Sequence, residues 1–138
     1  MYSKRRLLLS AAAVLALAAC NGPPADLQHG ETGVAAPAFS VVDATGAVRT
    51  LAEFAGRNVI LEWTNNGCPY VRKHYDAGNM QALQRDAAQR GWDWLQVISS
   101  APGQQGHLDG AGALAQVETD QATVTATLLD AEGVMGRA

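Results

Sequence analysis

The alternation of apolar and polar positions divides the chain after residue 37 into short segments of two kinds. Runs rich in β-branched and aliphatic side chains predict strands at residues 39–43, 47–51, 58–63, 92–99 and 123–129. Helices are predicted at residues 69–90 and 109–118, with Gly78 weakening the middle of the first. The segment 58–63 is so apolar that we expect a strand buried on both faces.

The order of these segments predicts an α/β domain. A hairpin with its turn at residues 44–46 comes first, and strands and helices then alternate, which is typical of a mainly parallel sheet. Right-handed crossovers would place the turn at Gly67 and Cys68 at the carboxyl end of strand 58–63. Open α/β sheets form their functional sites at this end.

The first nineteen residues have the pattern of an export signal. Lys4, Arg5 and Arg6 precede an apolar run at 7–19, which is short for a membrane span. The run ends in Leu-Ala-Ala-Cys20, which resembles the bacterial lipobox and implies cleavage before Cys20 and a lipid on its sulfur. The alternative is an ordinary signal peptide that leaves Cys20 as a free thiol; the Arg5-Arg6 pair suggests twin-arginine export only weakly.

These features predict three parts of the chain. Residues 1–19 are the lipoprotein signal peptide, 20–36 a lipidated, Gly- and Pro-containing tether, and 37–138 the folded domain. Asn21 is not the Asp that retains lipoproteins at the inner membrane in known sorting patterns. We therefore expect an anchor in the bacterial envelope facing the periplasm, with the outer membrane favoured.

Composition and charge exclude several classes of protein. The 138 residues carry 10 Lys and Arg against 13 Asp and Glu, so nothing indicates a nucleic-acid partner. Two cysteines are too few for a disulfide-dense scaffold or a cysteine-rich zinc site. The histidines share no ligand spacing, and we expect neither a metal nor another cofactor. The three tryptophans are expected in the core or a groove wall.

Cys68 is the candidate nucleophile because of its position. It follows a predicted strand and precedes Pro69, which suits the first position of a helix. The free N–H groups and the dipole of a helix N-terminus both favour thiolate, and Arg72 one turn later is spaced to support it. The alternatives are a small buried cysteine and a solvated basic helix face at 72–74.

The segment 59–71 resembles the active-site segment of the thioredoxin-like superfamily. Cys-Pro-Tyr-Val-Arg-Lys-His-Tyr at 68–75, with Gly-Asn-Met-Gln at 78–81, is similar to a peroxiredoxin-like (AhpC/TSA-type) branch of the redoxins. The resemblance covers about residues 37–138 and implies a three-layer α/β/α redoxin fold with an N-terminal β-hairpin. It also implies that Glu62, six residues before Cys68, stands where thioredoxins place a buried acid that accepts a proton; the alternative is a carboxylate facing water.

Three positions depart from the families that the segment resembles. Val71 stands where thioredoxins have the resolving cysteine, so an external thiol would have to resolve any mixed disulfide. Leu61 and Asn65 stand where true peroxiredoxins carry the proline and threonine of the peroxidatic pocket. The resemblance also leads us to expect that a C-terminal β-hairpin and helix are missing, because the chain ends five residues after its last predicted turn.

Three functions remain open from the sequence. The first is an exported thiol oxidoreductase, of the disulfide-exchange or antioxidant type, that uses Cys68 with a periplasmic partner protein or a small thiol or oxidant. The second is a thioredoxin-like binding module without catalysis. The third is a non-functional fragment.

Overall fold

A computed structural model describes Gly33 and residues 35–137 of the chain. The predicted signal peptide, Cys20 and nearly all of the predicted tether lie outside the described residues. Residues 36–137 belong to one compact unit.

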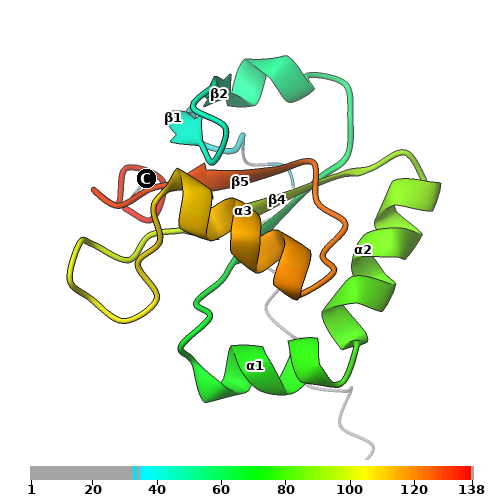
Figure 1. Ribbon diagram of the computed structural model, residues 1–138. Helices are drawn as coiled ribbons and strands as arrows, with labels where there is room; N and C mark the ends of the chain where they lie inside the picture. The colour runs from blue at the N-terminus through cyan, green and yellow to red at the C-terminus, as the bar shows by residue number, and fades with distance from the viewer. Residues whose placement is uncertain (1–32, 34, 138) are drawn as a thin grey trace, which may run out of the picture. The chain divides into compact units, whose positions relative to one another are not determined.

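Strands and helices alternate along this unit (Figure 1). In chain order they are β1 (Ser40–Asp43), β2 (Val48–Thr50), the 3₁₀ helix η1 (Leu51–Phe54), β3 (Val59–Trp63), α1 (Pro69–Asp76), α2 (Asn79–Gln89), β4 (Asp93–Ile98), α3 (Gly110–Thr119) and β5 (Ala126–Leu129). The predicted α/β class, with its N-terminal hairpin, is confirmed.

The five strands form one mixed sheet in the order β2-β1-β5-β4-β3. β3, β4 and β5 are parallel, with Leu61 opposite Leu95 and Leu95 opposite Ala126. β1 runs antiparallel to both of its neighbours, β2 and β5. The carboxyl ends of three parallel strands therefore meet at one edge, which is where the turn before Cys68 begins.

The prediction that strand 58–63 is buried on both faces is wrong. β4 is the buried strand, since every one of its residues is buried. Among the described strands β3 pairs with β4 alone, and its side chains Leu61 and Trp63 are 38% and 49% exposed. An apolar run predicts that a strand is at least partly buried, but it does not show which strands lie beside it.

Alternate residues of β4 face two different cores. Leu95 and Val97 belong to a cluster that η1 and the last turn help to cover, formed by Phe39, Val41, Phe54, Leu95, Val97, Ala126, Leu128 and Met135. On the other face Ile98 packs with Ala113 of α3 and with Ala44. Trp94 and Gln96 share that face, where Trp94 bonds Glu62 of β3 and Gln96 bonds Tyr75 of α1.

The predicted single helix at 69–90 is two helices. α1 ends at Asp76, and Gly78 takes a left-handed conformation with φ of +74° before α2 begins. Figure 1 shows that the two helices run in clearly different directions. The glycine therefore breaks the helix rather than weakening it, because a residue at positive φ cannot continue a right-handed helix.

Beyond β5 the described chain closes in a set of turns at residues 130–137. The Asp130 carboxylate accepts hydrogen bonds from the backbone N–H groups of Met135 and Gly136 at 3.1 and 3.2 Å. It also accepts one from the Ser99 hydroxyl at the end of β4. No helix among the described residues is both long enough and apolar enough to cross a membrane.

Candidate functional site

Cys68 is the N-cap residue of α1, as its position before Pro69 predicts. Its N–H donates to the Asn65 carbonyl at 3.0 Å, which closes the turn after β3. Its carbonyl accepts from the Arg72 N–H at 2.9 Å, which is the first bond of the helix. The side chain is half-buried, and its thiol has no hydrogen-bond partner within residues 35–137. The thiol therefore lies at the N-terminus of α1, and no described side chain forms a hydrogen bond with it.

The carboxylate of Glu62 is held by three donors on the helix-covered face of the sheet. The Tyr75 hydroxyl donates to Oε1 at 2.7 Å, and the Trp94 indole N–H donates to Oε2 at 2.7 Å. The Gln84 amide adds a longer bond of 3.3 Å to Oε2. No hydrogen bond joins Glu62 to Cys68 in the described part of the chain, and its role as proton acceptor remains a prediction.

Tyr75 is the centre of this polar network and was not singled out from the sequence. It is 3% exposed, and its hydroxyl accepts from the Gln84 and Gln96 amides at 3.0 and 2.6 Å while it donates to Glu62. Burial, and then the hydrogen bond to Glu62, raises the pKa of Tyr75 above its usual value. The phenol therefore stays protonated and remains a donor to the carboxylate.

Two buried glutamines complete the network. Gln96 in β4 accepts from the Thr127 hydroxyl of β5 at 3.1 Å, and Gln84 in α2 accepts from the Thr123 N–H at 3.0 Å. A signal for them was present in the sequence. Both are polar residues at positions where the strand or helix period requires a buried side chain, and such residues need partners.

The Arg72 guanidinium is shared between two carboxylates. It makes ion pairs with Asp76 in its own helix and with Asp120, which is 8% exposed, at the end of α3. The hydrogen bond to Asp120 is the main reason that the pKa of Arg72 is raised. Its support for the thiolate remains a prediction, while its observed contact joins α1 to α3.

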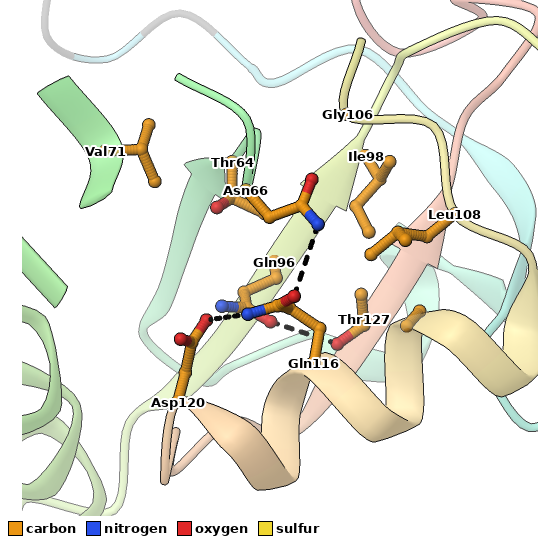
Figure 2. A pocket seen from close by; sticks show the side chains of 11 residues that line it. Thr64, Asn66, Val71, Gln96, Ile98, Gly106, Leu108, Gln116, Asp120 and Thr127 are labelled. Atoms are coloured by element: carbon orange, nitrogen blue, oxygen red, sulfur yellow. Dashed lines mark hydrogen bonds between the residues drawn. The ribbon is translucent and has the colours of Figure 1, made fainter. Parts of the chain in front are cut away.

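A small cavity lies between the turn before Cys68, α1, α3 and the sheet (Figure 2). The cavity has a volume of about 10 Å³, which is room for one water molecule. It is lined by Thr64, Asn66, Val71, Gln96, Ile98, Gly106, Leu108, Ala113, Gln116, Asp120 and Thr127. The Asn66 amide donates to Gln116, and the Gln116 amide donates to Asp120. Val71, at the position of a resolving cysteine in thioredoxins, contributes to this lining.

A wider, open hollow of about 230 Å³ lies beside the edge of β3. Its lining is mainly apolar and aromatic, and consists of Glu62, Trp63, Tyr70, Val71, His74, Tyr75 and Met80. Glu62 is the acidic group in this lining. Within the described ranges, no three His, Cys, Asp or Glu side chains are placed to hold a metal ion together.

Known proteins match this chain in three-dimensional structure only. No protein-family model and no curated protein matches the chain. A hypothetical protein from Sinorhizobium meliloti superposes with a TM-score of 0.64 at 23% identity, over 74% of this chain and 55% of that one. A secreted disulfide oxidoreductase from Mycobacterium tuberculosis gives 0.54 at 18% identity, over 72% and 65%.

A third solved structure is that of an exposed lipoprotein thioredoxin from Streptococcus pneumoniae. It superposes with a TM-score of 0.50 at 18% identity, over 70% of this chain and 68% of that one. The fold is thioredoxin-like. The chain spans little more than half the length of the Sinorhizobium protein, and identities below one quarter establish the fold and not the activity.

Proposed function

We propose that this chain is an exported thiol-disulfide oxidoreductase with Cys68 as its single nucleophile. The observation that carries the proposal is the place of Cys68 in a thioredoxin-like fold, as N-cap of the helix that follows a parallel strand. The positive end of the α1 dipole and its free N–H groups favour the thiolate there. No acidic side chain lies in the first turn of α1 to oppose that effect.

The proposed reaction is a thiol-disulfide exchange in two steps. The Cys68 thiolate attacks one sulfur of a disulfide, a new S–S bond forms, and the second sulfur leaves as a thiolate that takes up a proton. A second thiol then attacks the mixed disulfide, and Cys68 is released as a thiolate. Two electrons move between the partners, and no cofactor is required.

Within residues 37–138 Cys68 is the only cysteine, so the second thiol is proposed to come from another molecule. Val71 occupies the position one turn after Cys68 and has no sulfur. Cys20, the other cysteine of the chain, is proposed to carry lipid. The partner is therefore a periplasmic protein thiol or a small-molecule thiol.

The proposed setting is the periplasmic side of a membrane. The lipobox-like end of the signal at Cys20, the tether at 20–36 and Asn21 support an outer-membrane lipoprotein. Similar solved structures include one secreted protein and one exposed lipoprotein, which agrees with export of this chain. The tether would give the domain freedom to meet partners.

Mass spectrometry of the Cys20→Ser protein tests the proposed chemistry, because Cys68 is then the remaining thiol. Incubation with glutathione disulfide should give one glutathione adduct at Cys68, which dithiothreitol removes, and the Cys20→Ser/Cys68→Ser protein should give none. A parallel incubation with hydrogen peroxide shows whether Cys68 also forms a sulfenic acid. An adduct that forms in denaturant and not in the folded protein would contradict the proposal and favour a binding module.

A further inference from the structure

The turn before Cys68 fits closely against a distant loop. Asn65 and Gly67 lie in this turn, and Gln105 and Gly106 lie in the loop between β4 and α3. The Asn65 amide donates to the Gln105 carbonyl at 3.2 Å, and the Gln105 side-chain amide donates to the Gly67 carbonyl at 2.8 Å. We call these four residues the turn–loop contact.

Two glycines make the close approach possible, one on each side of the contact. A Cβ on Gly67 would lie 2.6 Å from Cγ of Gln105, which is closer than real side chains approach. A Cβ on Gly106 would overlap the side-chain amide of Asn65, and Gly106 also has a φ of +83°. Each amide side chain therefore lies over the glycine of the other segment, and a larger residue at either glycine would separate them.

The contact fixes the peptide group that leads directly into Cys68. The carbonyl of this group belongs to Gly67 and accepts from Gln105. Its N–H belongs to Cys68 and donates to the Asn65 carbonyl at 3.0 Å. With both ends of the peptide plane bonded, rotation of the plane is restrained, and so is the backbone from which the Cys68 side chain projects.

The same turn is held from a second side by α3. Figure 2 shows Asn66 bonded to Gln116, which is in turn bonded to Asp120. Asp120 pairs with Arg72 in the first turns of α1. This chain of contacts supports the middle of the turn, while Gln105 is the side chain that bonds the Gly67 carbonyl.

We infer that Gln105 is a positioning residue for Cys68, which rests on the proposed function. Gln105 is exposed to solvent, and its side-chain donor is nevertheless bonded to a backbone carbonyl rather than left to water. Removing that donor leaves the Gly67–Cys68 peptide held at its N–H end alone, by the Asn65 carbonyl, and so less restrained. The fraction of molecules with Cys68 correctly directed then falls, and the observed rate falls by the same factor.

The test compares Gln105→Met with Gln104→Met in the Cys20→Ser background. Methionine has a similar length and no amide donor. Gln104 is an exposed neighbour of the same type, and its side chain makes no hydrogen bond within the described part of the chain. The readouts are the second-order rate of glutathione adduct formation across pH and the hydrogen exchange of the Cys68 amide.

Gln105→Met should react more slowly, by up to about fivefold, the change that one neutral hydrogen bond makes in an equilibrium constant. The decrease should be the same at every pH, because the fraction of correctly directed thiol changes and its ionisation does not. The Cys68 amide should exchange faster, and a single cooperative urea transition should show that both methionine variants remain folded. Gly106→Ala, which disturbs the contact from the other side, should also react more slowly.

The outcomes separate this inference from the function on which it rests. Equal rates and equal amide exchange in the two methionine variants would overturn the role of Gln105 alone. A shift in the pH midpoint of the reaction rate, with the rate at high pH unchanged, would also overturn it, because that is an effect on thiol ionisation. An absence of any adduct in the Gln104→Met protein and its parent would overturn the proposed function, and the positioning role with it.

Discussion

At the scale of single residues, Tyr75 links three elements of the domain. Its hydroxyl joins Glu62 of β3, Gln84 of α2 and Gln96 of β4. In the sequence Tyr75 was part of the segment 68–75 that resembles the redoxins, and nothing in the sequence indicated its hydrogen-bond partners. Hydrogen bonds between residues 9 to 21 positions apart depend on how the elements pack, and the order of residues alone does not define that packing.

Tyr75→Phe should destabilise the protein by about 2 kcal/mol, because it leaves buried polar groups of Glu62, Gln84 and Gln96 short of a partner. Urea unfolding followed by circular dichroism measures the change. Tyr70→Phe is the matched control in the same helix, since Tyr70 is 79% exposed and its hydroxyl has no hydrogen bond with a described residue. Equal unfolding midpoints for the two variants would show that the network adds nothing to stability.

For Cys68, in contrast, the local sequence was enough to predict its position in the structure. A cysteine followed by Pro69, after an apolar run and turn residues, defines a helix N-terminus from local information alone. The structure has Cys68 at that N-cap position. Arg72 was correctly placed one turn later in the helix, but its carboxylate partner Asp120 is 48 residues away, so the sequence did not reveal where its guanidinium is bound.

At the scale of elements, the first hairpin depends on one buried carboxylate. Asp43 at the end of β1 is 2% exposed and accepts hydrogen bonds from Thr45, Ala47 and Arg49. Burial alone would raise the pKa of Asp43, but the bonds from Thr45 and Arg49 and from the backbone outweigh it and lower the pKa from 3.8 to about 2. The carboxylate form therefore stabilises the turn between β1 and β2.

This pKa predicts a loss of stability in acid. The folded state binds the Asp43 proton more weakly than the unfolded state, so the stabilisation is complete above about pH 4 and is lost as the pH falls from about 4 to about 2. Asp43→Asn should be less stable at pH 7 and should lose less on acidification, as measured by urea unfolding at each pH. Glu132→Gln, an exposed carboxylate without an observed partner among the described residues, should keep the full acid dependence of the parent protein.

The helix predicted at 69–90 shows where local propensity is insufficient at this scale. The residues on both sides of Gly78 are good helix formers, which favoured a single helix across it. Packing of α2 brings Gln84 to Tyr75 and Ala87 into a buried position. The left-handed conformation of Gly78 changes the direction of the chain between α1 and α2, and this conformation goes with the packing of α2 rather than with local propensity.

At the scale of the whole molecule, the proposed lipid anchor determines where the domain acts. In a bacterium with an outer membrane, the wild-type chain should be found in the membrane fraction, and Cys20→Ser should be released from it, because one Ser hydroxyl cannot replace acyl chains. Metabolic labelling with a fatty-acid analogue, followed by membrane fractionation, measures both effects. Cys68→Ser is the control and should remain labelled and membrane-bound.

A soluble, unlabelled wild-type chain would contradict the anchor and favour the alternative of an ordinary signal peptide. The result of this fractionation does not bear on the proposed chemistry at Cys68, because the adduct experiment uses the Cys20→Ser protein, which carries no lipid. Anchor and activity are therefore tested separately.

The sequence by itself determined most elements of this domain and the position of its candidate nucleophile, Cys68. Hydrophobic periodicity, turn residues and a proline at the start of a helix act over a few neighbouring positions, and these signals located the strands, the hairpin and the N-terminus of α1. Tertiary structure alone decided that β4 rather than β3 is the buried strand, that Arg72 pairs with Asp120, and that Gln105 holds the peptide before Cys68. The physical reason is distance along the chain, because each of these contacts joins segments more than thirty residues apart and forms only after the sheet has brought them together.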